Sequence, residues 1–513
     1  MKHLTIKTLL LVGAICPSFV ACDDDKEPEV IYEFSVKVED SAIAAPAEGC
    51  AQTILVTSTK TAGSSTTNVA YEVKSAPEWA PATIEQTALV INVAENSTTQ
   101  AREPGCVTLL QAESGKELTI NITQAGYEYS MSLAGSYTTP RCKVLGIVPE
   151  ITGFDKNPIF AWTVKGPNDS EASAAGNGST LNFIKLETGE YEVSLTVTDD
   201  SGISMVSTSK VNVEMEKEAY SPYLSEVIDL ELAPYSSVGA GNSFFGMTDT
   251  KKSAMEKASE KLNKDFSTSN TGLSLGPLGG HIVFKFDHTV MNVSGLRDFR
   301  IGSYASQTAY PAPGIVYVAF DTNQNGQPDE DEWYEIAGSE YGKTTTLSNL
   351  TVIYNRPDNF LTTVSMGKEV NDYITYTING VSGTLSSGSM PNTIPVWPFW
   401  LRESDEGKTI TFTGVTQLPS NTQMNGMFPG ATQWYDYGYV CNSDSKDEIN
   451  SSFDIDWAVD KDGKPVHLPG VDFIKVQTAT MMDAGGWYGA LKTSLNCAID
   501  LHLAGKKIET VTR

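Results

Sequence analysis

The stretch GEYEVSLTVTD, residues 189–199, decides the class of fold. Apolar side chains stand at every second position along it: Tyr191, Val193, Leu195 and Val197. Successive side chains of a strand point to opposite faces of a sheet, so this period of two predicts a strand with one buried face. We expect Val193, Leu195 and Val197 to face a core and Tyr191 to close a corner of a β-sandwich.

Short segments with the same alternation recur along the chain, whereas helical spacing is almost absent. The clearest predicted strands are residues 34–38, 53–58, 70–73, 88–93, 117–122, 158–164, 281–287, 314–320 and 472–477. Only residues 249–264 predict a helix, capped by Thr248 or Asp249, with one apolar stripe formed by Met255, Ala258 and Leu262. Repeated short strands separated by turn residues are typical of β-sandwiches.

The fold class expected from these patterns is mainly β. Two immunoglobulin-like β-sandwich modules precede a larger jelly-roll-like β domain with one short helix. The predicted boundaries are a signal peptide at 1–21, an acidic tether at 22–32, sandwiches at 33–126 and 127–216, and the large domain at 217–513.

Charge and motifs narrow the function. The 513 residues carry a formal net charge of −27, which argues against nucleic acid as a partner because phosphate recognition needs a basic face. The sequence has no HExxH, GxSxG, P-loop or dinucleotide-binding motif. We therefore expect no catalytic residues and a protein that is not an enzyme.

The loop after the predicted strand 314–320 has the spacing of a calcium site. In DTNQNGQPDEDE, residues 321–332, oxygen-bearing side chains occupy positions 1, 3, 5, 9 and 12, and glycine occupies position 6. This matches the pattern D-x-[DN]-x-[DN]-G-x5-E, in which one tight loop supplies the oxygens that Ca²⁺ requires. The predicted ligands of a structural Ca²⁺ are Asp321, Asn323, Asn325, the carbonyl of Gln327, Asp329 and Glu332. The alternative is an ordinary polar turn between two strands.

The N-terminus indicates export. A short basic head precedes an apolar run that is too short to span a bilayer, and small residues lead to Cys22. This segment resembles a bacterial lipoprotein signal, which implies a lipid on Cys22. The acidic residues 23–25 resemble the surface-export signal of Bacteroidetes lipoproteins, which implies an outer-membrane protein facing the cell exterior. The alternative is a cleaved secretory peptide with an incidental Cys22.

Five cysteines remain beyond residue 22, and they are widely spaced. Their separation excludes a zinc ribbon or a CxxC redox site. Cys50 and Cys106 could pair within one small domain, but spacing leaves the connectivity open.

Phrases in each domain resemble modules of Bacteroidetes surface proteins. Residues 76–79, 93–96 and 122–126 are similar to the BACON module, and residues 189–199 to a PKD-like domain. In the large domain the matching phrases are residues 221–227, 278–283, 313–316, 333–335, 453–460 and 472–476. These resemble the C-terminal domain of a "cell-surface protein" family related to cobalamin-binding lipoproteins of the BtuH type. The resemblance implies capture of cobalamin or a related corrinoid for transport by a TonB-dependent outer-membrane transporter.

Aromatic loops are the candidate ligand platforms. A flat ligand with apolar faces needs exposed aromatic side chains among polar partners, and proline and glycine beside these aromatics favour loops. The predicted ligand-binding residues are Trp397, Phe399, Trp400, Trp434, Tyr435, Tyr437, Trp487 and Tyr488. Burial in the core is the alternative for each of them. Since the same features suit carbohydrate, a surface glycan-binding or adhesion protein is the second functional hypothesis.

Overall fold

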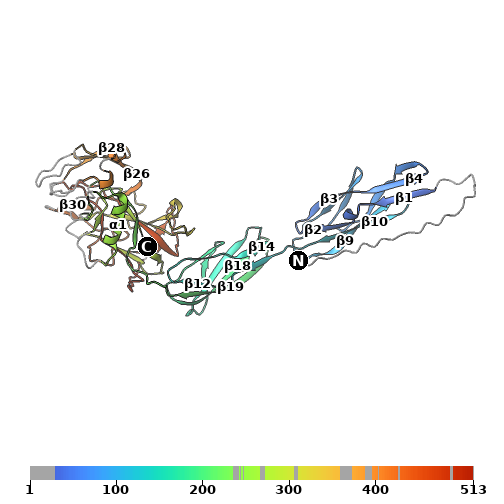
Figure 1. Cartoon of the computed structure of the whole chain (residues 1–513), viewed down its shortest axis with the longest axis horizontal. Helices are drawn as coiled ribbons and strands as arrows, with labels where there is room; N and C mark the ends of the chain where they lie inside the picture. Colours follow the sequence, from blue (N-terminus) through green and yellow to red (C-terminus); the bar gives the residue numbers. More distant parts are fainter. Residues whose placement is uncertain are drawn as a thin grey trace, which may run out of the picture. The chain divides into compact units, whose positions relative to one another are not determined.

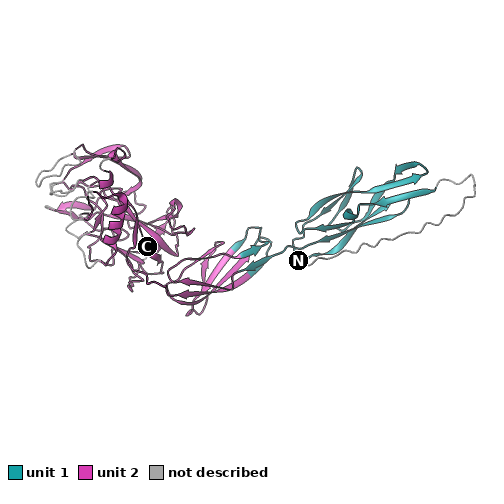
Figure 2. Ribbon diagram, in the orientation of Figure 1, with its two compact units in different colours: residues 1–132, 150–159, 198–205 teal, residues 133–149, 160–197, 206–513 magenta. Residues whose placement is uncertain are grey.

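The computed structural model describes residues 29–234, 242, 244–246, 248–265, 272–305, 310–358, 372–387, 396–401, 404–425, 428–485 and 489–511. The predicted signal peptide and Cys22 lie outside these residues. The chain forms two compact units, residues 1–132, 150–159 and 198–205 in one, and residues 133–149, 160–197 and 206–513 in the other (Figure 2). Within the described ranges, no helix has the length and apolar character needed to span a membrane.

The first module is built from three sheets (Figure 1). One sheet has the order β1 (Val30–Ser35), β4 (Thr57–Ala62), β5 (Ser65–Asn68). The second has the order β2 (Ala42–Ala45), β10 (Glu117–Gln124), β9 (Arg102–Gln111), β6 (Tyr71–Ser75). The third has the order β3 (Cys50–Leu55), β8 (Ala88–Val93), β7 (Ala82–Glu85). Alternate residues of these strands, including Ile54, Leu89 and Ile120, are fully buried and form one core.

The second module has one five-stranded sheet and two strand pairs. The large sheet has the order β12 (Ser136–Pro140), β19 (Ser204–Glu214), β18 (Gly189–Thr198), β15 (Ile159–Lys165), β16 (Ser173–Gly176). The pairs are β11 (Ser130–Ser132) with β14 (Glu150–Thr152), and β13 (Leu145–Ile147) with β17 (Leu181–Phe183).

The stretch 189–199 forms β18, and the burial of its side chains follows the predicted alternation. Val193, Leu195 and Val197 of β18 are fully buried. The buried Tyr191 donates its hydroxyl to the carbonyl of Glu187 at 3.0 Å. This hydrogen bond confirms the predicted corner role of Tyr191, because a buried phenol needs an acceptor.

The C-terminal part contains a six-stranded antiparallel sheet and several smaller ones. The large sheet has the order β20 (Glu226–Glu231), β22 (His281–Met291), β34 (Gly470–Thr478), β24 (Gly314–Ala319), β25 (Trp333–Ile336), β33 (Ala458–Val459). A four-stranded sheet has the order β28 (Val381–Leu385), β27 (Ile374–Ile378), β26 (Leu347–Asn355), β29 (Thr409–Gln417).

Shorter strands and single helical turns complete this part. The remaining strands are β32 (Ser452–Phe453), β23 (Phe299–Gly302) and β36 (Cys497–Asp500) in one sheet, β21 (Leu273–Ser274) with β35 (Ser494–Leu495), and β30 (Thr422–Asn425) with β31 (Phe428–Ala431). The 3₁₀ turns of the described chain are η1 (Val38–Ser41), η4 (Glu330–Glu332), η5 (Phe399–Leu401), η6 (Glu406–Lys408) and η7 (Ile455–Trp457).

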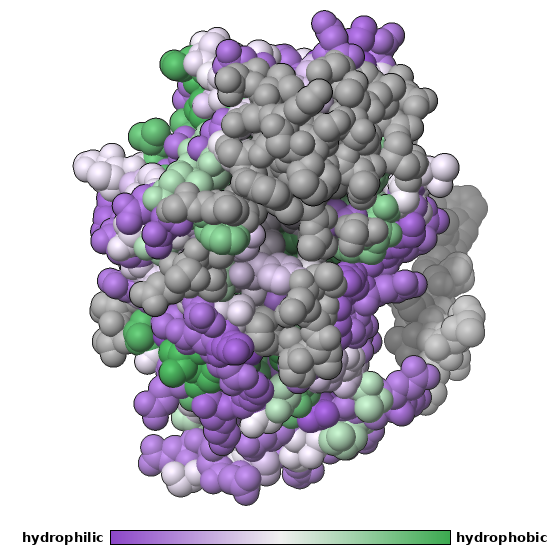
Figure 3. Space-filling view, turned by 90° about the vertical axis from the view of Figure 1, so that its left-hand side faces the viewer, coloured by the Kyte–Doolittle hydropathy of each residue, from purple (hydrophilic) through white to green (hydrophobic). Residues whose placement is uncertain are grey.

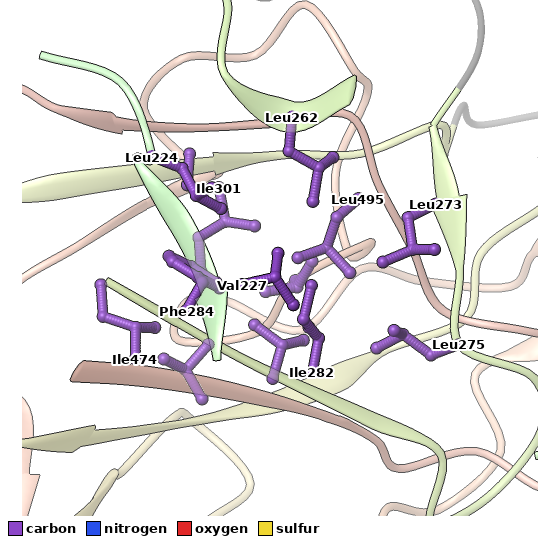
Figure 4. Packing of buried hydrophobic residues seen from close by; sticks show 14 of the residues in the cluster. Leu224, Val227, Leu262, Leu273, Leu275, Ile282, Phe284, Ile301, Ile474 and Leu495 are labelled. Atoms are coloured by element: carbon purple, nitrogen blue, oxygen red, sulfur yellow. The ribbon is translucent and has the colours of Figure 1, made fainter. Parts of the chain in front are cut away.

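Two large hydrophobic cores lie in the described C-terminal part, beside a small cluster formed by Ile315, Leu418, Tyr435, Tyr439 and Ala479. The larger one buries one face of the six-stranded sheet, whose residues Ile282, Phe284 and Ile474 belong to the same core as Leu262 of the helix (Figure 4). The smaller one surrounds the four-stranded sheet. Because side chains alternate along each strand, the other face of the six-stranded sheet carries the residues between these core positions.

The helix α1 (Lys251–Leu262) lies where it was predicted, but its cap is Thr250 rather than Thr248 or Asp249. Thr250 Oγ1 accepts from the Ser253 amide at 3.2 Å, while the Asp249 carboxylate accepts from Lys257. Ala254, Ala258 and Leu262 are buried, and Met255 is half-buried and packs against the same core, so the predicted stripe faces the core and also includes Ala254.

These sheets confirm the predicted fold class: a mainly β protein with sandwich modules followed by a larger β-rich part with one described α-helix. Cys50 and Cys106 are both free thiols, as are the three other cysteines beyond residue 22. The face seen in Figure 3 is mostly hydrophilic over the described residues, and hydrophobic residues form small separate patches there.

Candidate calcium loop and ligand pocket

The predicted calcium loop connects β24 to β25, which pair with Ala319 opposite Trp333. Its first residue organises the turn. One oxygen of Asp321 accepts from the amide of Asn325 at 2.9 Å, and the other from the amide of Gly326 at 2.8 Å. Gly326 has φ of +77°, a backbone region that glycine adopts without a steric cost.

Further hydrogen bonds join the early and the late positions of the loop. Asn323 and Asn325 both donate their side-chain amides to Asp329 Oδ2, at 2.6 and 2.9 Å. Asn325 Oδ1 accepts from the Gln327 amide at 2.7 Å. Glu332 is buried, and its two oxygens accept from the Thr322 amide at 2.7 Å and the Asp329 amide at 3.2 Å.

The donor set of this loop fits Ca²⁺. Three carboxylates, two amide side chains and a main-chain carbonyl come from twelve consecutive residues, and all of them offer hard oxygens. In the described part of the chain, no three Asp, Glu, His or Cys side chains form a metal-ligating group by themselves. A cation in this loop would therefore need the amide and carbonyl oxygens as well as the carboxylates.

Asp472, which was not predicted as a site residue, lies against this loop. Its Oδ2 accepts from the Asp321 amide at 2.8 Å, and Oδ1 accepts from Thr289 Oγ1 at 2.5 Å. Burial, with the negative charges of Asp321 and Glu332 nearby, raises the pKa of the Asp472 carboxyl. A carboxylate near the start of the predicted strand 472–477 was the available signal, but the sequence does not show that it lies beside Asp321.

A pocket of about 720 Å³ opens beside the same hairpin. Its floor is the face of the six-stranded sheet that points away from the larger core. Tyr317 of β24 lies directly opposite Glu335 of β25 on one side and Lys475 of β34 on the other. Glu335 in turn lies opposite Val459 of β33. These four residues therefore form one row across the sheet on one face.

Glu335 is the unusual group in this pocket. Burial raises the pKa of its carboxyl to about 7. Among the described residues, no lysine, arginine or histidine forms an ion pair with it. Lys475, which is also partly desolvated and has a lowered pKa, lies over the ring of Tyr317 at 5.7 Å from its centroid. Tyr317 thus separates the two charged side chains.

The walls of the pocket are formed by residues at the ends of β25 and β33 or just beyond them. Trp333 is half-buried and Tyr341 is 37% exposed, so each presents ring surface to the opening. Asp460 Oδ1 accepts from the amides of Asp462 and Lys464, both at 2.9 Å, which fixes the turn at the rim. A carboxyl with a shifted pKa in a pocket with aromatic walls, as Glu335 is here, is typical of a binding site.

The aromatic loops expected to bind ligand are mostly core. Trp397 is fully buried and donates its indole N–H to the Gly407 carbonyl at 2.9 Å. Phe399 and Tyr435 are also buried, and Tyr435 donates its hydroxyl to the Pro419 carbonyl. The prediction that these three are exposed platforms is wrong, because each ring fills space between sheets and each polar group has an acceptor inside.

The other predicted platforms divide into two groups. Trp400, Trp434 and Tyr437 are half-buried and pack against the larger core. Trp400 meets Phe245 edge-on at 6.2 Å, and Tyr437 lies 4.9 Å from Trp457. Trp487 and Tyr488 lie outside the described residues.

The sequence matches no known protein-family model and no curated protein. Among solved structures, the four N-terminal Ig domains of Dscam1 isoform 6.9 align with 37% of this chain and 47% of their own, at 10% identity and a TM-score of 0.16. The fibronectin(III)-like modules of Clostridium thermocellum CbhA align with 36% of this chain and 98% of theirs, at 11% identity and a TM-score of 0.15. The EC1-2 segment of human protocadherin-24 aligns with 37% and 100%, at 12% identity and a TM-score of 0.18. The chain thus spans about half the length of the Dscam1 fragment. These scores are too low to bear on function, and the fold class rests on the sheets described above.

Proposed function

We propose that this chain is a cell-surface ligand-binding lipoprotein whose two sandwich modules act as a stalk for a binding head formed by the C-terminal part. The observation that carries the proposal is the pocket beside the calcium-type loop, with aromatic walls and an unpaired carboxyl on its floor. The proposal includes a lipid on Cys22, an outer-membrane location facing outward, and a structural Ca²⁺ in the loop 321–332. It assigns no catalytic residue.

Cobalamin or a related corrinoid, delivered to a TonB-dependent transporter, is the ligand that the family resemblance supplies. The broad apolar faces of a corrin ring would suit Trp333 and Tyr341, and its amides would suit Asp460 and Asp462. Most of the ligand would extend beyond the pocket, because a volume of 720 Å³ is typical of pockets for drug-sized molecules.

A surface glycan is the second candidate, and the size of the pocket favours it. One or two sugar units are of drug size, and half-exposed aromatic rings beside carboxylates suit their apolar faces and hydroxyls. The same head would then serve adhesion or glycan capture.

Calorimetric titration of the purified full-length chain with cyanocobalamin, in calcium and again in chelator, tests the first candidate. Tight one-to-one binding that Trp333→Ala weakens supports a corrinoid in this pocket. No heat at micromolar protein contradicts it, and a glycan array on the same preparation then tests the second candidate. Binding that Trp333→Ala leaves unchanged would place the ligand elsewhere on the protein.

A further inference from the structure

We infer that the pocket between Tyr317, Trp333, Glu335 and Tyr341 selects a ligand that presents an organic ammonium group, either a protonated amine or a quaternary nitrogen. The inference rests on the proposed ligand-binding function of this pocket and names the chemical class that the pocket recognises.

The charges around the pocket leave a negative excess. Three carboxylates line it: Glu335, Asp460 and Asp462. Of the two lysines at its edge, Lys343 is paired with Glu340 at 2.8 Å, and Lys461 is exposed. A cationic group on the ligand would balance this excess, because a buried carboxylate is stable when a positive charge lies beside it.

The cation inside the fold is too far away to neutralise Glu335. Lys475 lies two strands from Glu335 in the same row, with Tyr317 between them. Two strand spacings are about 10 Å. The lysine interacts with the ring of Tyr317 instead, so the carboxyl of Glu335 faces the pocket without a cationic partner in the described chain.

Aromatic rings on the floor and the walls complete the recognition. Tyr317, Trp333 and Tyr341 all line the pocket. Aromatic faces attract ammonium groups, and quaternary ammonium ligands are typically held between such rings. A carboxyl on the floor and rings on the walls together favour a cation with an apolar shell over a metal ion, which needs several oxygens.

The test compares choline with 3,3-dimethylbutan-1-ol, which has nearly the same shape without the charge, by titration of the full-length chain. Trp333 lines the pocket, so tryptophan fluorescence is a second readout. We expect choline to bind at least fivefold more tightly than the neutral alcohol. Equal affinity, or no binding of choline at millimolar concentration, would overturn the inference, and neither result depends on the outcome with cyanocobalamin or the glycan array.

The variant Glu335→Gln keeps the size of the side chain and removes its charge. We expect it to lower choline affinity at least fivefold and to leave the affinity for the alcohol unchanged. Glu330→Gln, which removes an exposed carboxylate from the same hairpin outside the pocket, is the matched control and should bind choline like the native chain. A native-like preference for choline in Glu335→Gln would overturn the role of Glu335.

The pH dependence of choline binding provides a further test on the native chain. Choline keeps its charge at every pH, and only the ionised form of Glu335 attracts it. With a carboxyl pKa of about 7, the ionised fraction, and hence the affinity, rises about tenfold from pH 6 to pH 8. The other titratable or charged side chains that face Glu335 or the pocket are Tyr317, Tyr341, Lys343, Tyr439, Asp460, Lys461, Asp462 and Lys475. Glu335→Gln should abolish the rise, whereas the same rise in that variant would assign it to one of these groups and contradict the inference.

Discussion

The hairpin at residues 314–336 carries Trp333 beside polar sequence, and the segment at residues 396–401 carries Trp397 and Trp400 beside a proline. The structure nevertheless places Trp333 and Trp397 in opposite environments. Trp397 is fully buried in the smaller core, with its indole N–H bonded to Gly407. Trp333 stands at the start of a strand, half-buried, on the wall of a pocket. The proline-rich segment looked more like a binding loop, and it is the hairpin that lines the pocket.

The difference shows what controls the exposure of an aromatic ring. Proline and glycine beside a ring determine the local backbone, but they do not determine what packs on top of it. Trp397 is covered because strands from elsewhere in the chain fold over it. Trp333 remains accessible because its face of the six-stranded sheet is only partly covered.

The largest expected effect on stability comes from substituting Trp397, the buried tryptophan of the two. Trp397→Ala removes a fully buried ring and leaves an unfilled cavity, so we expect a loss of about 3–5 kcal/mol of unfolding free energy in the C-terminal part. Denaturant unfolding followed by circular dichroism measures it. A loss below about 1 kcal/mol would mean that the site can collapse or that the ring is not buried.

The second effect concerns the loop 321–332, which immediately precedes Trp333. Glu332→Gln removes one charge from the predicted Ca²⁺ ligands, so it should abolish the rise in melting temperature that calcium produces. In the native chain that rise corresponds to about 2.7 kcal/mol when calcium is at 100 times its Kd. Calorimetric melting in calcium and in chelator measures it.

Asp331→Asn is the control for this experiment, because Asp331 is an exposed carboxylate of the same loop outside the predicted ligand set. It should keep the calcium-dependent rise. An equal rise in the native chain and in Glu332→Gln would contradict calcium binding by this loop.

The third effect is smaller and depends on pH. Burial raises the Glu335 pKa from 4.5 to about 7, so the folded chain holds a proton there that the unfolded chain releases between these values. Its stabilising contribution is complete below the unfolded pKa and is lost as pH rises through about 7. Glu335→Gln should remove about 1–2 kcal/mol of this pH dependence, after allowance for solvent in the pocket.

Unfolding free energies measured at pH 4.5 and pH 7.5 give the pH dependence that Glu335 contributes. The exposed Glu330 provides the comparison, since Glu330→Gln should leave the slope unchanged. A steeper loss of stability with rising pH in Glu335→Gln than in the native chain would show that the sign is wrong.

The smallest expected effect on stability comes from substituting Trp333, the half-buried tryptophan. Trp333→Ala should cost less than about 1 kcal/mol of unfolding free energy, because the ring is only half-buried and no core closes over it. Its effect on binding should be large, with choline affinity reduced at least fivefold. An equal loss of unfolding free energy in Trp333→Ala and in Trp397→Ala would contradict the difference in burial between the two tryptophans.

The elements that sequence predicted correctly are those whose signal is local. The alternation at residues 189–199 yields a strand with Val193, Leu195 and Val197 inside, because the period of side chains along a strand is a property of the backbone itself. The helix is predicted by spacing within four residues, and its cap was misplaced because Thr248, Asp249 and Thr250 are all chemically suited to it. In the loop 321–332, Asp321 accepts a hydrogen bond from the amide of Gly326, and Glu332 accepts one from the amide of Thr322. These bonds also join residues that are close in sequence.

The sequence alone therefore determined the mainly β class, most of the predicted strands, the single described α-helix and the calcium-type spacing, whereas the predicted strand 34–38 ends at Ser35 and the predicted strand 53–58 is divided between β3 and β4. Tertiary structure decided the pocket, because Val459 and Asp460 join the hairpin residue Glu335 there only when β33 pairs with β25. It also decided the contact of Asp472 with Asp321, which are 151 positions apart, and the burial of Trp397. Pairing between distant strands depends on how all the apolar faces pack together, and no window of neighbouring residues contains that information.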